Sequence, residues 1–147
     1  MRLSQHFTLD EFTLSQTAVR SGIDNSPPPD VLENLRALAA FLEDVRENFQ
    51  SPLLISSGYR SPAVNEAVGG AKNSAHLSGL AADFTIPSYG PPLAVAKSIA
   101  KSDLQFDQLI HEFGRWVHVA IAPPGKTPRR EVLSIRSAAE GYIPGLR

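Results

Sequence analysis

The chain has 147 residues, with 14 lysines and arginines against 15 aspartates and glutamates, which leaves a formal net charge of −1. This balance provides no basic surface for a phosphate backbone, so nucleic acid is not expected as a partner. There are no cysteines, which excludes thiol nucleophiles, disulfide frameworks and cysteine-based zinc sites. A bound metal would therefore need His, Asp or Glu ligands.

The length suits one domain over residues 1–147, with its core over about residues 7–121 and a C-terminal extension over residues 123–147. The first residues, MRLSQHFTLDEF, lack the apolar core of a signal peptide, and no apolar run is long enough to span a bilayer. We therefore expect synthesis in the bacterial cytoplasm, no membrane insertion and a monomer.

Two helices are expected in the first third of the chain. Thr8 is a candidate cap for a short turn or helix that follows it. Asp30 and Glu33 have the spacing of a capping box at the start of a longer helix. The apolar residues after Asp30 recur at helical spacing on one face. They are Val31, Leu32, Leu35, Leu38, Ala39, Leu42, Val45 and Phe49.

The middle of the chain alternates between short strands and helices. Residues 53–55 are a strand candidate, and Ser61 with Pro62 is a good start for a short helix through Val68. In residues 80–86, apolar side chains alternate with Ala81, Asp83 and Thr85, so Asp83 is expected to point away from the core. Residues 93–100 follow two prolines and are predicted to form an amphipathic helix.

Two further strands are predicted in FDQLIHEF and WVHVAIA, joined by a turn at Gly114 and Arg115. In the second run, Val117 and Val119 alternate with His118, so His118 is expected opposite the apolar face. The later residues are rich in Arg, Pro and Gly, and we expect a solvated terminus with one possible strand at residues 132–135.

His76, Asp83 and His118 are candidate metal ligands. His76 precedes Asp83 by seven residues, and Gly79 between them permits a tight turn, so a loop ligand and a strand ligand can face one ion. Two histidines and one carboxylate, with a vacant position for water, match a catalytic zinc site. This donor set suits zinc better than magnesium or calcium, which favour oxygen ligands. Iron in a facial triad would use the same ligands.

The stretch SAHLSGLAAD, followed by WVH, resembles the S-x-H-x-x-G-x-A-x-D and W-x-H signature of zinc D-alanyl-D-alanine carboxypeptidases and phage-type murein endopeptidases. The hedgehog signalling domain shares the fold of this family. The similarity runs from about Phe7 to Ile121, includes SSGYRSPAVN and FDQLIHEF, and is greatest to the compact phage or prophage members. The resemblance implies that His76, Asp83 and His118 bind one Zn²⁺ ion.

The resemblance also implies roles for two other residues. Arg60 matches the arginine that stabilises the tetrahedral intermediate in the carboxypeptidase branch. Ser74 matches the motif serine and is expected to line the substrate site, although a loop serine that bonds its own backbone is an equal alternative. Trp116 is a further candidate for substrate binding, and core packing is its alternative.

The general base is where the sequence departs from many family members, which carry a carboxylate three residues before the last histidine. Arg115 holds that position and cannot accept a proton. We expect Glu112 to be the base, with His111 as the alternative base or oxyanion donor. A turn of two residues would place His111 opposite His118, whereas a loop of three residues would place Glu112 there.

We therefore predict an α+β domain, in which a small and largely antiparallel sheet carries the zinc on one face and helices pack on the other. The expected function is hydrolysis of an amide bond in peptidoglycan stem peptides, by a D,D-carboxypeptidase or endopeptidase, in phage or prophage lysis of the cell wall. The alternatives are a zinc-stabilised binding module without catalysis and a structural phage component that docks on the cell wall.

Overall fold

A computed structural model describes all residues from Met1 to Arg147 and contains one six-stranded sheet with the strand order β1-β2-β4-β3-β5-β6. The strands are β1 (Leu54–Ser57), β2 (Ala81–Thr85), β3 (Gln108–Glu112), β4 (Trp116–Ala120), β5 (Glu131–Ile135) and β6 (Tyr142–Pro144). The helices are α1 (Leu9–Thr13), α2 (Gln16–Ser21), α3 (Pro29–Phe49), α4 (Pro62–Ala67) and α5 (Pro92–Lys101), with a 3₁₀ turn, η1 (Ala75–Ser78). This is the predicted α+β fold.

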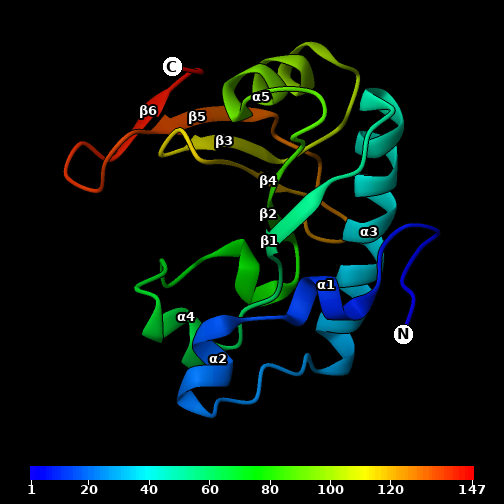
Figure 1. Ribbon diagram of the computed structural model, residues 1–147, viewed down its shortest axis with the longest axis vertical. Helices are drawn as coiled ribbons and strands as arrows, with labels where there is room; N and C mark the ends of the chain where they lie inside the picture. Colours follow the sequence, from blue (N-terminus) through cyan, green and yellow to red (C-terminus); the bar gives the residue numbers. More distant parts are fainter.

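The sheet is antiparallel except where β3 pairs with β5 in parallel. Figure 1 shows β3, β5 and β6 with α5 at one end of the molecule and α1, α2 and α4 at the other, while α3 runs beside both ends. None of the helices is both long enough and apolar enough to cross a bilayer.

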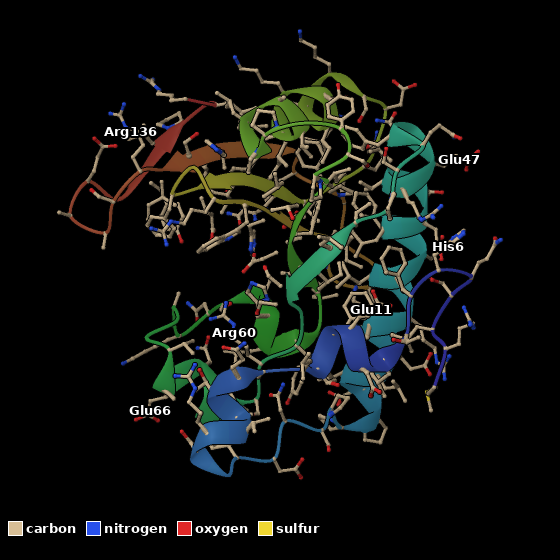
Figure 2. All side chains as sticks on the ribbon, in the orientation of Figure 1. His6, Glu11, Glu47, Arg60, Glu66 and Arg136 are labelled. Atoms are coloured by element: carbon tan, nitrogen blue, oxygen red, sulfur yellow. The ribbon has the colours of Figure 1, made fainter.

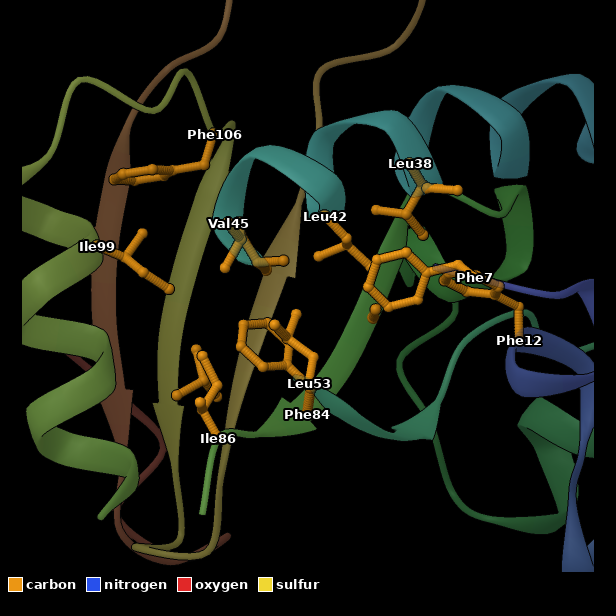
Figure 3. Close-up of a cluster of buried hydrophobic side chains, with 14 of the residues drawn as sticks. Phe7, Phe12, Leu38, Leu42, Val45, Leu53, Phe84, Ile86, Ile99 and Phe106 are labelled. Atoms are coloured by element: carbon orange, nitrogen blue, oxygen red, sulfur yellow. The ribbon is translucent and has the colours of Figure 1, made fainter. Parts of the chain in front are cut away.

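The core lies between α3, α5 and one face of the sheet. Side chains from α3 meet Phe84 of β2 and Ile99 of α5 there (Figure 3). The predicted apolar face of α3 is buried, which confirms the helical spacing read from the sequence. The predicted capping box of Asp30 is wrong. The helix begins one residue earlier, at Pro29, because proline is favoured in a first helical turn, and Asp30 therefore lies inside that turn.

Strand alternation places the polar side chains as predicted. Ala82 and Phe84 of β2 and Val117 and Val119 of β4 belong to the buried core. Because successive side chains point to opposite faces of a strand, Asp83 and the residue between the two valines, His118, lie on the other face. The two remaining caps also form, since Thr8 makes a capping box with Glu11, and Ser61 accepts a hydrogen bond from Val64 at the start of α4.

The C-terminal segment is not a solvated terminus. It contributes β5 and β6 to the sheet, and β5 covers the strand that was possible at residues 132–135. The main-chain N–H of Phe113 donates to Ile135 at 2.7 Å, and Ser134 donates to Gly145 at 2.9 Å. Parallel pairing of β5 with β3 depends on contacts between distant segments, which the composition of the tail does not reveal.

Candidate metal centre

His76 is held in the 3₁₀ turn η1 by its neighbours. Ser74 caps the turn by accepting a hydrogen bond from the His76 main-chain N–H at 3.2 Å, and Gly79 closes it in the left-handed conformation at φ +71°. The ring Nδ1 of His76 lies 2.6 Å from the carbonyl oxygen of Gly58, so Nδ1–H donates to that oxygen. This bond fixes the tautomer and leaves Nε2 with a free lone pair, as a metal ligand requires.

Asp83 and His118 are direct cross-strand partners in β2 and β4. His118 Nδ1 lies 2.9 Å from Asp83 Oδ1, and His76 Nε2 lies 3.3 Å from the same oxygen. One ligand atom from each of the three residues lies within 4.8 Å of the others. The exposed fractions are only 2% for His76 and 6% for Asp83 and His118, so the cluster is buried.

The charge of Asp83 suits a cation. Burial opposes ionisation of Asp83, but the imidazoles of His76 and His118 outweigh it and hold the pKa of Asp83 far below its ordinary value. Burial also lowers the pKa of His118, yet its hydrogen bond to Asp83 and the negative charge of Asp83 leave that pKa raised. An ionised buried carboxylate between two imidazoles is a donor set of two nitrogens and one oxygen, which fits zinc.

Glu112 lies beside this cluster on the same face of the sheet. Its Oε2 is 4.0 Å from His118 Nδ1, and its Oε1 accepts a hydrogen bond of 2.8 Å from the indole N–H of Trp116. Burial raises the pKa of Glu112 above its ordinary value, while His118 and the Trp116 hydrogen bond act in the opposite direction. The carboxylate is thus positioned and partly desolvated, as a general base requires.

The hairpin register differs from the one expected. Its loop does hold three residues, 113–115, but Glu112 pairs with Trp116, and Ile110 pairs with His118. The expected pairing of Glu112 with His118 is wrong by two positions along the strand. Because side chains alternate with a period of two, Glu112 nevertheless faces the same side as His118.

His111 points to the opposite face of the sheet. It pairs with Val117, whose side chain is in the core, and its Nδ1 lies 3.0 Å from the main-chain oxygen of Arg147. The alternative in which His111 acts as base or oxyanion donor is therefore wrong, because the sheet separates its ring from the metal cluster. Its hydrogen bond holds the C-terminal segment instead.

A model of the family described as Peptidase M15 matches residues 5–120, most of the chain. The chain belongs to the Peptidase M15 family. Members of this family are zinc-dependent and act on peptidoglycan, so this chain is a metallopeptidase with a fitting metal cluster. No curated protein matches the chain.

The family match ends at Ala120, the last residue of β4, so β5 and β6 of this M15 peptidase lie outside it.

Arg60 of the M15 peptidase lies between β1 and α4, nearer to the sheet than Glu66 (Figure 2). Its main-chain N–H donates to the carbonyl oxygen of His76 at 3.1 Å. The positive charge of its guanidinium opposes the increase in the pKa of His118. Its Nε is buried and makes no hydrogen bond within the chain.

Ser74 and Trp116 bond to neighbouring protein groups. Ser74 holds the turn that carries His76, which is the backbone-bonding alternative considered for it. The indole of Trp116 holds Glu112 and lies beside Phe113, with the ring centroids 5.5 Å apart. Both side chains thereby position other members of the site, and their roles in substrate binding stay predictions.

Sequence reasoning missed two groups that interact with residues of the site. One is the carbonyl oxygen of Gly58, which orients His76 and leaves no side-chain signal. The other is Tyr142 of β6, whose pKa is raised by burial and further by the charges of Glu112 and Asp83, while Arg60 lowers it. No local pattern places Tyr142 near these residues, because its position depends on the parallel pairing of β3 with β5.

Proposed function

We propose that this M15 peptidase hydrolyses an amide bond in the peptide stems of peptidoglycan, with one zinc ion held by His76, Asp83 and His118. The observation that carries this proposal is the position of Glu112, whose carboxylate lies 4.0 Å from His118 on the face of the metal cluster. A metal-ligand set with a carboxylate beside it has the components of a hydrolytic site.

When bound, zinc polarises a carbonyl oxygen and acidifies water. Glu112 then accepts a proton from the attacking water and passes it to the leaving amine, and the Trp116 indole keeps its carboxylate oriented. Arg60 donates to the oxygen of the scissile carbonyl as negative charge develops there, and the support for this role is that its positive charge acts on His118 of the cluster.

The face occupied by Glu112 favours catalysis over a binding module. A module that kept only the metal would have no need for a carboxylate beside the ligands, and a buried carboxylate is unfavourable without a partner. Glu112 is mostly buried, and its partner is the indole N–H of Trp116, which donates a hydrogen bond to it. The carboxylate therefore fits a catalytic role better than a structural one.

The reaction is a D,D-carboxypeptidase or an endopeptidase cleavage, and we place it in phage or prophage lysis of the cell wall. Support for the phage setting comes from the resemblance of the SAHLSGLAAD and WVH segments to compact phage-type members. Carboxypeptidase action would release terminal D-alanine, whereas endopeptidase action would divide a stem peptide or a cross-link. The products therefore distinguish the two reactions.

The test is digestion of purified sacculi by zinc-loaded protein, with mass spectrometry of the released products. Glu112→Gln keeps the side-chain size and should lower the rate at least about a hundredfold, because the general base is lost. Glu66→Gln, on the exposed surface of α4, is the matched control and should retain the wild-type rate. Chelated protein should be inactive. Folded, zinc-loaded wild type that releases no product would refute the proposal.

A further inference from the structure

The C-terminal extension brings an aromatic side chain to the metal face of the sheet. Glu112 of β3 pairs with Ile135 of β5, and Ile135 pairs with Tyr142 of β6. Residues that are direct partners across a sheet point to the same face. Tyr142 therefore shares the face of Glu112, His118 and Asp83, although it lies outside the family match.

The position of Tyr142 suits contact with a bound molecule. Two strand spacings separate its Cα from that of Glu112, about 10 Å, and the intervening side chain is the buried and apolar Ile135. The side chain of Tyr142 is 57% exposed, and its hydroxyl makes no hydrogen bond within the chain. An exposed phenol beside the site thus has an unused donor.

The electrostatic surroundings of Tyr142 agree with this placement. Burial of its inner part raises the pKa of the phenol, and the negative charges of Glu112 and Asp83 raise it further, against the charge of Arg60. The three charged groups that act on Tyr142 are thus all groups of the proposed site. The phenol stays protonated at neutral pH and remains a hydrogen-bond donor.

The hairpin that carries Tyr142 is held firmly to the sheet. Ser134 donates to Gly145 at 2.9 Å and accepts from the main-chain N–H of Arg147 at 3.0 Å. Arg136 pairs with Glu140 across the β5–β6 connection at 2.8 Å (Figure 2 shows Arg136 there). These bonds set the direction of β6, so Tyr142 is presented to the site from a fixed strand and not from a loose terminus.

We propose that Tyr142 is a substrate-binding residue, whose hydroxyl donates a hydrogen bond to a carbonyl or carboxylate oxygen of the stem peptide on the β5–β6 side of the metal centre. This inference rests on the proposed peptidase function. It assigns a substrate contact to the C-terminal extension that follows the family match. The apolar side chain of Ile135 lies between Glu112 and Tyr142 on this face, which favours a small uncharged side chain of the peptide at that position.

The test compares Tyr142→Phe, which removes only the hydroxyl, with Tyr89→Phe, a matched change at a half-exposed tyrosine that packs on Phe49. Activity is measured on a purified disaccharide pentapeptide and on its cross-linked dimer. Tyr142→Phe should raise KM about three- to tenfold with kcat within about twofold of wild type, because a uniform binding contact is lost. Tyr89→Phe should match wild type, and both variants should melt as wild type does.

Binding without turnover supplies a second readout. In the zinc-loaded Glu112→Gln background, calorimetry with the same two muropeptides should show a Kd about three- to tenfold higher when Tyr142→Phe is added. Unchanged KM and Kd in Tyr142→Phe would overturn the inference while the peptidase function stands. Wild type that neither binds nor cleaves either muropeptide would overturn the proposed function and this inference with it. Wild type that binds without cleavage leaves the Kd comparison to decide the role of Tyr142.

Discussion

Removal of zinc from the cluster of His76, Asp83 and His118 should lower the melting temperature substantially. The three ligands are 2–6% exposed, and His118 lies 35 residues beyond Asp83. An unfolded chain does not hold such distant ligands together, so the ion binds the folded state. At a free zinc concentration about a hundredfold above Kd, binding stabilises the fold by about 2.7 kcal/mol. For a chain of this size, that corresponds to an increase of about 5–11 °C.

The assay is scanning calorimetry of chelator-treated protein before and after zinc is restored at about a hundred times its measured Kd. Magnesium at the same concentration should give almost no shift, because it favours oxygen ligands. His118→Ala should lose the zinc-dependent increase, whereas His6→Gln, far from the cluster in the N-terminal segment, should keep it. Identical melting curves with zinc and with chelator, or an equal zinc shift in His118→Ala, would refute a zinc site at these residues.

Three further changes test other parts of the structure. Trp116→Phe removes the hydrogen bond to Glu112, so kcat should fall about tenfold and the acidic limb of the pH–rate profile should move to higher pH, as stopped assays across pH would show. Gly58→Ala puts a Cβ 2.7 Å from the backbone of Phe12, so calorimetry should show a loss of about 1–3 kcal/mol, and zinc affinity measured by titration should weaken. Burial raises the pKa of Glu43, but hydrogen bonds from Ser4 and His6 outweigh burial and leave that pKa lowered. The ionised Glu43 therefore stabilises the folded state above the ordinary carboxyl pKa, and this stabilisation is lost as the pH falls. Urea unfolding should therefore show Glu43→Gln less stable than wild type by about 1 kcal/mol at pH 7, and this difference should shrink as the pH falls through the lowered pKa of Glu43.

The cluster of His76, Asp83 and His118 could be predicted because its signals are local. The alternation of apolar and polar residues in β2 and β4 placed Asp83 and His118 on the face opposite the core, and the spaced motif added His76. Both signals depend on residues within a few positions of each other. The structure brings the three side chains together from a turn and two neighbouring strands, as the motif predicted.

The hairpin register was not predictable from local signals. Gly114 is the natural turn residue, but Phe113 also adopts the left-handed conformation, at φ 58°, which is unfavourable for a bulky residue. The hydrogen bond from the Phe113 N–H to Ile135 of β5 supports this conformation. The position of the loop thus depends on a strand that follows it by some twenty residues, and the same distant pairing hid the location of Tyr142.

His76 and the proposed base, Glu112, depend on different parts of the fold. Gly58 orients His76, and the next residue, Tyr59, donates its main-chain N–H to Phe12 of α1 at 2.7 Å. Substitutions that disturb α1 should therefore weaken zinc binding, because they displace Gly58 and Tyr59 at the end of β1. Glu112, in contrast, is held by Trp116 within one hairpin that β5 supports. Substitutions at the Gly58 end of β1 should consequently weaken zinc binding through His76 and leave Glu112 oriented, whereas damage to the β3–β4 hairpin should affect both His118 and Glu112.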